Sequence, residues 1–256
     1  MIALATKKPG AKPTAESEEI CTYLDWDSRF FEKRIARVKP NRLDDEGMEK
    51  VMAWCQKNRI DCLYFLADSD HAESAWLAEK NGFLQADERL TFERPITPDD
   101  LSIRPAANVR LAREEEIGLL RAVAHRGHRD TRFYYDPHFD RSKCDLLYET
   151  WIENSFHGFA QAVLVAESNG QAIAYLTCHL RADESQIGLI GVSEHQQGAG
   201  HGTRMVQQFL TWSAHQGSRR ATVVTQGRNA RAQGLYKRNG FALATTEFWY
   251  HRWFFD

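Results

Sequence analysis

The sequence predicts an α/β protein of two lobes, each with strands in a mixed sheet and flanking helices. The segments LAEKNGF at 77–83 and LYKRNGF at 235–241 both end a helix with Asn-Gly and an aromatic residue. Extended without a gap, this match aligns residues 62–94 with residues 220–252. Each copy reads as strand, polar turn, short helix, Asn-Gly stop and closing strand, which indicates two related lobes. The simpler alternative is that strand–helix–strand units resemble one another in any α/β protein.

Composition limits the classes of partner. The chain has 256 residues, 43% of them hydrophobic, and on size alone forms one large domain or two small ones. A formal net charge of -2 gives no general attraction to nucleic acid. Five cysteines without a C-x-x-C pair are expected to be reduced, in a cytoplasmic protein. We expect residues 1–19 to be a flexible tail, and no apolar run approaches membrane length.

The first lobe is expected at 20–100 and the second at 107–256. The second lobe should start with a strand at 109–112 and a helix whose acidic first turn, residues 114–116, suits the helix dipole. A helix at 144–156 and two strands at 161–168 and 171–180 follow, and Asn169-Gly170 between the strands predicts a hairpin. The next strand, 186–192, contains Gly188 and Gly191, which indicate a bulge or a close approach.

The segment after that strand, SEHQQGAGHGTRMVQQFL, carries the most information. Gly198, Gly200 and Gly202 open a helix, so several free backbone N–H groups should meet at one point and bind phosphate or pyrophosphate. A nucleotide triphosphatase loop would need Gly-Lys-Ser/Thr, and a dinucleotide fingerprint would need G-x-G-x-x-G after an early parallel strand. A tight loop with glycines serving only the turn is the structural alternative.

Gln197, Gly200 and Gly202 match a Gln/Arg-x-x-Gly-x-Gly/Ala loop, and Asn229, Tyr236 and the triplet Asn239-Gly240-Phe241 follow in order. With these motifs, residues 107–256 resemble the GNAT superfamily of acyl-CoA-dependent N-acyltransferases. The resemblance implies a GNAT-fold mixed sheet, preceded by a smaller truncated GNAT-like α/β lobe. It also implies acetyl-CoA or another short acyl-CoA as co-substrate, no metal, and Tyr236 as the catalytic acid. The residues that it implies for cofactor binding are Ile190, Gly191, Val192, Gln197, Gly198, Ala199, Gly200, His201, Gly202, Thr203 and Asn229. Gln197, where many relatives have Arg, leaves the strength of phosphate binding open.

A narrower resemblance rests on WDSRFF at 26–31, TRFYYDPHF at 131–139, WIEN at 151–154 and IGLI at 187–190. These segments are similar to the dTDP-fucosamine N-acetyltransferase group. The similarity implies transfer of an acyl group, most simply acetyl, to the amine of a dTDP-linked amino-deoxysugar for surface polysaccharides. The partner is then a sugar nucleotide, with a homodimer left open. The first lobe has no glycine loop, and Ala78 stands where the second has Tyr236, so it should not run the chemistry.

The chemistry also follows from the residues. When an amine attacks a thioester, charge develops on the carbonyl oxygen, where a backbone N–H near residues 190–192 can stabilise it. The departing sulfur needs a proton, and a Tyr hydroxyl with a reference pKa of about 10 can give it. The alternative for Tyr236 is an ordinary core tyrosine. His179, Glu184, Glu194 and water are all open as the base, so none is assigned.

The segment HRGHRDTRFYY at 125–135 could meet the sugar nucleotide. Arg126, Arg129 and Arg132 suit a diphosphate, and the three aromatic residues suit a sugar or base. The narrower resemblance favours Arg132, Phe133 and Tyr134 for substrate binding, while the alternative is basic residues at a helix C-terminus. No metal is expected at His125 and His128, which lack a nearby Cys or acidic ligand set. Acylation of a peptide, polyamine or other small amine, or a non-catalytic acyl-CoA-binding module, remains as an alternative function.

Overall fold

The computed structural model describes residues 19–103 and 106–254 and divides the chain into two compact units. The first unit comprises residues 1–87 together with 247–256, and the second comprises 88–246. These units differ from the expected lobes, because residues 247–253 of the strand at 242–253 belong to the first unit. The predicted tail, apart from Glu19, lies outside the described residues.

The first unit is a small α/β layer. Its elements are β1 (Cys21–Tyr23), α1 (Asp25–Phe31), β2 (Ile35–Val38), α2 (Asp45–Lys57), β3 (Cys62–Asp68) and α3 (Ala72–Lys80), and its strands lie in the order β1-β2-β3-β10. β1 and β2 are antiparallel, whereas β2 and β3 are parallel. Apolar side chains of α2, α3 and these strands form one core, including Val51, Phe65 and Leu77.

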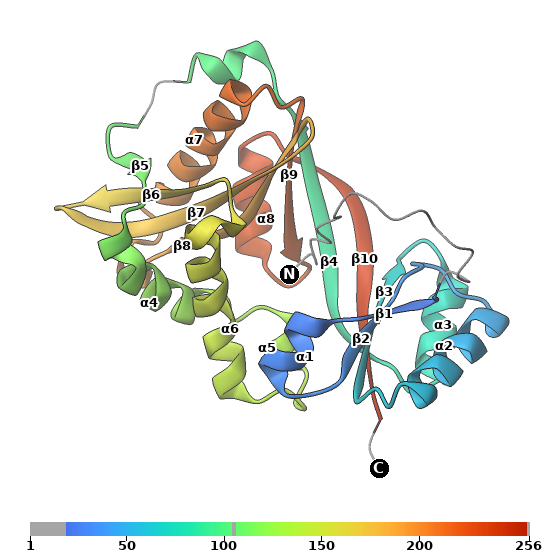
Figure 1. Ribbon diagram of the computed structural model, residues 1–256. Helices are drawn as coiled ribbons and strands as arrows, with labels where there is room; N and C mark the ends of the chain where they lie inside the picture. Colours follow the sequence, from blue (N-terminus) through green and yellow to red (C-terminus); the bar gives the residue numbers. More distant parts are fainter. Residues whose placement is uncertain (1–18, 104–105, 255–256) are drawn as a thin grey trace, which may run out of the picture. The chain divides into compact units, whose positions relative to one another are not determined.

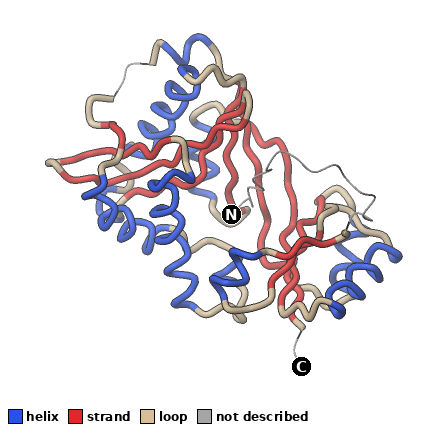
Figure 2. Tube along the Cα trace, in the orientation of Figure 1, coloured by secondary structure: helices blue, strands red, loops and turns tan. Residues whose placement is uncertain are grey.

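The second unit has a longer mixed sheet, in the order β4-β9-β8-β7-β6-β5. Its strands are β4 (Leu84–Pro95), β5 (Val109–Leu111), β6 (Ala162–Ser168), β7 (Gln171–Arg181), β8 (Glu184–Val192), β9 (Arg220–Gln226) and the start of β10 (Ala242–Trp253), whose residues 247–253 belong to the first unit. Its helices are α4 (Ile117–Gly127), α5 (Arg132–Tyr135), α6 (Arg141–Asn154), α7 (His201–His215) and α8 (Ala230–Arg238). Short helical turns are η1 (Pro98–Leu101), η2 (Glu114–Glu116), η3 (Ser155–Phe159) and η4 (Glu194–Gln196). In this unit α7 lies on one side of β6, β7 and β8, and α4 and α6 lie on the other (Figures 1 and 2).

The predicted hairpin is confirmed. Asn169 and Gly170 both have positive φ, 50° and 77°, as a type I′ turn requires, and β6 pairs with β7 in antiparallel register on either side. The acidic turn before α4 differs from the prediction in one residue. Glu116 is buried, accepts two hydrogen bonds from Arg110 at 2.7 and 2.9 Å, and caps the N–H of Arg113. The ion pair with Arg110, rather than the helix dipole alone, accounts for a carboxylate at position 116.

The duplication predicted from the sequence extends to the strand pairing, because the two copies exchange their closing strands. An offset of 158 residues relates β3 to β9, α3 to α8 and β4 to β10 without a gap. The closing strand of the first copy, β4, pairs with β9, while residues 247–253 of β10 pair with β3. The registers correspond as well: Arg89 faces Gln226, and Glu247 faces Asp68. The C-terminal strand thus completes the sheet of the N-terminal unit.

We expect the first unit to depend on this strand. Tyr250 is 1% exposed and its ring stacks 6.3 Å from that of Phe65, so Tyr250→Ala should lower the free energy of unfolding by about 3–5 kcal/mol. Leu243 in the same strand is 52% exposed, and Leu243→Ala should change the free energy by less than about 0.5 kcal/mol. Urea unfolding followed by circular dichroism measures both. Equal midpoints for the two variants would contradict the strand's role.

Candidate active site

The site begins where two parallel strands separate. β8 pairs with β9 from Glu184 to Ile187 only, although β8 continues to Val192 and β9 to Gln226. Beyond the last pair the two strands diverge in Figure 1. Both strands end at the same edge of the sheet, followed by the turns that lead into α7 and α8. We call the unpaired edges of β8 and β9 beyond Ile187 the opening. Ligands of open α/β sheets bind outside the carboxyl ends of the strands.

Backbone donors of β8 face the opening. The N–H of Ser193 donates to Ile173 of β7, and N–H groups of an extended strand alternate between its two edges. The N–H groups of Ile190 and Val192 therefore point away from β7, toward the opening. The side chains of both residues pack against the core that α7 and α8 cover.

The glycine loop forms the N-terminus of α7, as predicted. Gly198 and Gly200 have φ of 84° and 81°, and a Cβ added to either would meet nothing within 4 Å. The turn therefore needs glycine for its backbone conformation and leaves bare backbone on its outer side. Gly202 differs, because its Cβ would stand 3.3 Å from Leu235, so it permits the close packing of α7 and α8.

The start of α7 presents backbone donors of the kind that bind an anionic group. The 15-residue helix directs its free N–H groups at residues 200–203 outward. His201 opens the helix, is 9% exposed, and its buried Nδ1 has no hydrogen-bond partner among the described residues. An anionic group at the helix end would satisfy such donors. The loop residues from Gln197 to Thr203 are those the sequence indicated, although Gln197 has a partner of its own.

Gln197 connects the end of β8 to α8. Its amide donates to the carbonyl of Val192 at 3.0 Å and its oxygen accepts a hydrogen bond from Arg231. Arg231 is exposed in the first turn of α8 and brings a positive charge to the loop. Sequence reasoning missed Arg231, because only the fold brings it beside Gln197.

Asn229 and Tyr236 lie at the start and near the end of α8. Asn229 is the N-cap, and its side-chain oxygen accepts from the N–H of Ala232 at 2.9 Å. This bond fixes the residue but leaves its amide N–H groups as donors. Tyr236 is 3% exposed, with its ring about 6 Å from those of Phe92 and Phe241, in the same core as Ile190 and Val192. Burial raises the pKa of Tyr236, so its hydroxyl stays protonated at neutral pH.

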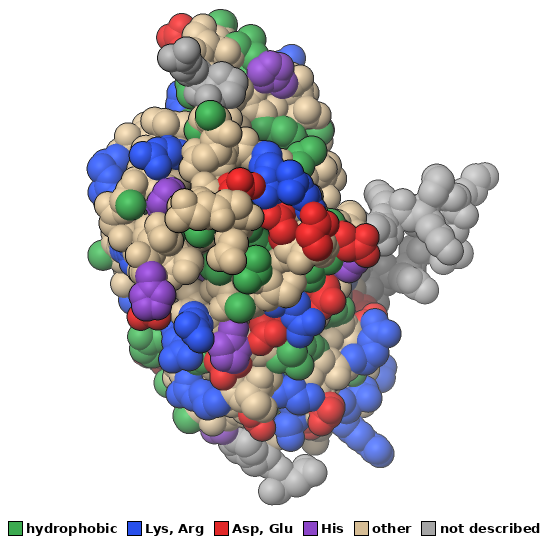
Figure 3. All heavy atoms as spheres, turned by 90° about the vertical axis from the view of Figure 1, so that its left-hand side faces the viewer, with side chains coloured by type: hydrophobic (Ala, Val, Ile, Leu, Met, Phe, Trp, Pro, Cys, Tyr) green, Lys and Arg blue, Asp and Glu red, His purple; other side chains and the backbone are tan. Residues whose placement is uncertain are grey.

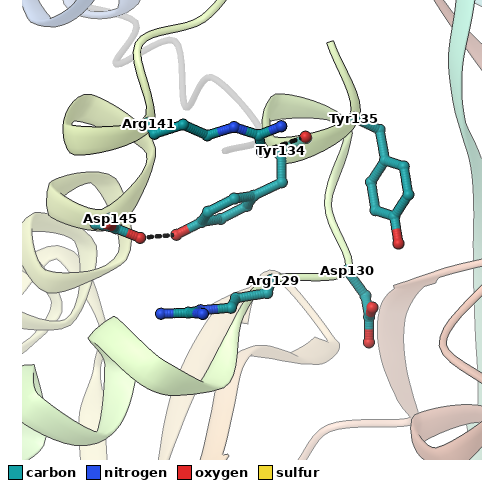
Figure 4. A pocket seen from close by; sticks show the side chains of 6 residues that line it. All are labelled: Arg129, Asp130, Tyr134, Tyr135, Arg141 and Asp145. Carbon is teal, nitrogen blue, oxygen red and sulfur yellow. Dashed lines mark hydrogen bonds between the residues drawn. The ribbon is translucent and has the colours of Figure 1, made fainter. Parts of the chain in front are cut away.

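A polar pocket of about 450 Å³ lies next to α5. Its lining residues are Arg129, Asp130, Tyr134, Tyr135, Arg141 and Asp145. The Tyr134 hydroxyl donates to Asp145 at 2.6 Å, and Arg141 donates to the Tyr134 carbonyl. Figure 4 shows Arg129 alongside the Tyr134–Asp145 pair, with Asp130 and Tyr135 on the other side of the pocket. The pocket therefore combines two guanidinium groups, two carboxylates and two aromatic rings.

Two of the three residues predicted to bind the substrate, Arg132 and Phe133, lie in the interior. Arg132 is 8% exposed and its guanidinium lies 4.4 Å from the centre of the Phe133 ring. Phe133 is 2% exposed and packs against Phe139 and Trp151. Both belong to the interior because α5 turns them away from the surface, whereas Tyr134 lines the pocket. Arg129, which the sequence also offered for a diphosphate, lines it too.

Two contacts anchor this pocket beside the opening. Arg228, in the turn between β9 and α8, lies 3.6 Å from the centre of the Tyr135 ring. His128, next to Arg129, shares a 2.7 Å hydrogen bond between its Nε2 and the hydroxyl of Tyr175 on β7. Burial lowers the pKa of His128 to about 4, so the imidazole is neutral.

Side chains of β7 explain the two glycines predicted for β8. A Cβ at Gly191 would stand 2.6 Å from the Tyr175 ring, and one at Gly188 would stand 2.3 Å from Nε2 of His179. β8 is also bulged against β7 at Gly188, so the expected bulge is confirmed, whereas the groups that approach both glycines are side chains rather than another backbone or a ligand. Two of the three residues considered as bases are engaged elsewhere: His179 bonds Thr177, and Glu184 bonds Arg220 and Thr222.

On the face that Figure 3 shows, basic and acidic side chains of the described residues are interspersed, and neither sign of charge forms a single large patch. In residues 19–103 and 106–254, no three His, Cys, Asp or Glu side chains are grouped to hold a metal ion. Nor do these residues include a helix with the length and hydropathy to cross a membrane.

Comparison with known proteins agrees with this geometry. Residues 124–241 match the Acetyltransferase (GNAT) family. A 123-residue stretch is 31% identical to the spore coat polysaccharide biosynthesis protein SpsD of Bacillus subtilis, covering 48% of this chain and 43% of SpsD. The chain thus spans less than half the length of this curated relative.

Solved structures share the fold over most of the chain. A conserved protein of unknown function from Staphylococcus epidermidis superimposes with a TM-score of 0.65, at 14% identity, over 95% of this chain and 94% of its own. A GCN5-related N-acetyltransferase from Sphaerobacter thermophilus gives a TM-score of 0.61, also at 14% identity, over 91% and 76%. Residues 124–241, which include the glycine loop, therefore match an acetyltransferase domain of the GNAT family, and the mixed α/β fold shared with the solved structures agrees with that match.

Proposed function

We propose that the protein is an N-acyltransferase that moves an acyl group, most simply acetyl, from acyl-CoA to the amine of a nucleotide-linked amino-deoxysugar. The observation that carries the proposal is the opening between β8 and β9, which has a bare glycine cradle at its edge and a charged, aromatic pocket anchored beside it. The family match supports acyl transfer, and SpsD, a polysaccharide biosynthesis protein, supports a sugar acceptor.

The residues suited to hold the acyl-CoA follow from the cradle. The N–H groups from Gly198 to Thr203 would bind the pyrophosphate, with His201 as a further donor. Arg231 would supply the charge that Gln197 lacks, and Asn229 would donate from its amide group. The co-substrate supplies the activated acyl group, and no metal enters the reaction that we propose.

The chemistry needs a donor at each site of developing charge. The N–H groups of Ile190 and Val192 face the opening, so either could stabilise the carbonyl oxygen as the amine attacks. Tyr236 packs in the same core as these residues and keeps its proton, so it can donate to the departing sulfur. A tyrosine with only a packing role would be buried in the same way, and the Tyr236→Phe variant separates the two roles.

The acceptor would occupy the pocket. Arg129 is exposed, and no hydrogen bond or ion pair holds its guanidinium within the described residues, so it suits the diphosphate. Tyr135 is 54% exposed and offers a ring to the sugar or the base, while the exposed carboxylate of Asp130 suits an ammonium group. Both signs of charge in one pocket match a ligand that carries a diphosphate and an amine.

Thiol release from acetyl-CoA, measured with a panel of acceptors, tests the function. The panel comprises dTDP-linked amino sugars, the free amino sugars, a peptide and a polyamine. We expect turnover with the nucleotide-linked amines. Turnover with the peptide or polyamine instead would assign another acceptor class, and coenzyme A binding without turnover would indicate an acyl-CoA-binding module.

Gly200→Ala should weaken coenzyme A binding by at least roughly 10-fold, because it places a Cβ on the bare outer side of the cradle and strains a left-handed residue. Gly217→Ala is the matched control, since Gly217 has φ of 73° and an equally open Cβ position just after the other end of α7. Calorimetry measures both affinities. Equal affinities in the two folded variants would remove the loop from the cofactor site.

Tyr236→Phe should lower kcat by about 10²–10⁴-fold if its hydroxyl is the general acid, with the acyl-CoA dissociation constant nearly unchanged. The phenyl ring preserves the packing against Phe92 and Phe241, so the melting temperature should change little. A core tyrosine gives the opposite pattern, with turnover retained in the folded fraction. Steady-state kinetics and thermal melting on one preparation distinguish the two.

Arg129→Gln should raise KM for a nucleotide-linked amino sugar by roughly 10- to 100-fold, the value of a charged hydrogen bond, and leave KM for acetyl-CoA unchanged. Arg126→Gln is the control, because Arg126 is exposed on α4 but does not line the pocket. An equal effect on free amino sugars, which carry no diphosphate, would argue against this contact.

A further inference from the structure

The bulge in β8 is held by side chains as well as by backbone. Leu176 pairs with Ile190 and Cys178 with Ile187, so Thr177 alone faces the two residues Gly188 and Leu189. The N–H of Leu189 donates to Oγ1 of Thr177 at 2.8 Å. Thr177 is fully buried, so this hydroxyl is committed to the bulge.

His179 determines how that hydroxyl is oriented. Its Nε2 lies 3.2 Å from Oγ1 of Thr177. Burial lowers the pKa of His179 to about 4, so the ring is neutral and carries one proton. In the tautomer with this proton on Nδ1, Nε2 accepts the hydroxyl proton of Thr177. The hydroxyl donates to His179 and accepts from Leu189, which leaves it a single orientation.

The sequence is adapted to this arrangement at Gly188. A Cβ there would stand 2.3 Å from Nε2 of His179 and 2.7 Å from Oγ1 of Thr177, so any larger residue would displace the pair. The ring of Phe159, 5.5 Å from that of His179, closes the other side. A valine at position 177 would suit a buried strand equally well in shape, so packing alone does not account for the hydroxyl.

We propose that Thr177 and His179 are positioning residues, which hold the bulge of β8 so that the next outward N–H groups, those of Ile190 and Val192, point at the acyl carbonyl. This inference rests on the proposed function and adds residues that need not touch either substrate. By capturing the N–H of Leu189, Thr177 fixes the Gly188–Leu189 peptide plane, which is joined through Cα of Leu189 to the plane that carries the N–H of Ile190. A small rotation of that plane would misalign a donor whose value depends on its direction.

The first experiment tests the bond in the free protein by amide hydrogen exchange. Thr177→Val removes the hydroxyl and keeps the shape, so exchange at the Leu189 amide should accelerate by roughly 10-fold or more. Thr177→Ser keeps a hydroxyl and should restore most of the protection. His179→Phe keeps a ring and removes the acceptor, and should have a smaller effect in the same direction. Unchanged exchange in Thr177→Val would overturn the proposal.

The second experiment uses acetyl-CoA labelled with ¹³C at the acetyl carbonyl. We expect the infrared carbonyl stretch of the bound molecule to be shifted from its value in solution, and Thr177→Val to move it back while kcat falls by about 10-fold or more. The coenzyme A dissociation constant should stay within about twofold, because the cradle is untouched. Thr177→Ser should recover both the stretch and kcat.

Thr211→Val is the matched control, since Thr211 is also buried and its hydroxyl bonds the carbonyl of Asp100, far along α7 from the cradle. It should cost comparable stability without altering the carbonyl stretch. An identical change in stretch and kcat in this variant would reduce Thr177 to a structural residue. Failure of the wild type to transfer acetyl to any amine would instead refute the proposed function, and the Leu189 exchange result would stand independently.

Discussion

The end of pairing between β8 and β9 is the constraint on which the rest of the second unit depends. Parallel strands that separate leave backbone N–H and C=O groups without partners, which costs free energy unless something else bonds them. Pairing stops at Ile187, five residues before β8 ends. The bulge, the two glycines under Tyr175 and His179, and the glycine turn before α7 all lie within the stretch that follows. If β8 and β9 stayed paired along their whole length, none of these features would be needed.

The duplication shows how one copy became specialised. Both copies keep the strand, helix and closing strand at the same spacing, and both keep the Asn-Gly stop. Ala78 is fully buried in the core of the first unit, at the position that corresponds to Tyr236. The first unit also lacks the glycine loop ahead of this segment. What the two copies share is therefore the architecture that pairs strands, whereas the residues suited to chemistry occur once.

Local features were predictable because their causes lie within a few residues. The Asn169-Gly170 turn, the glycine loop and the helix of Tyr236 are fixed by backbone conformation and short-range periodicity. The compact units differ from the expected lobes because the partner of residues 247–253 lies some 185 positions earlier in the chain. The burial of Arg132 and Phe133 could not be predicted, because the one-turn helix α5 decides which side chains face inward. Arg231 and Thr177 escaped notice because their roles exist only after α8 and β8 have been brought into position.

The exchange of closing strands has a consequence for synthesis on the ribosome. The N-terminal unit buries Tyr250 in its core and pairs β3 with residues 247–253, so it lacks one strand of its sheet until the end of the chain has emerged. Until then β3 presents an unpaired apolar edge, of the kind that promotes association between nascent chains. The N-terminal unit therefore cannot complete its sheet first, although N-terminal domains usually fold before the rest of the chain. The sheet of β1, β2 and β3 must wait for residues 247–253.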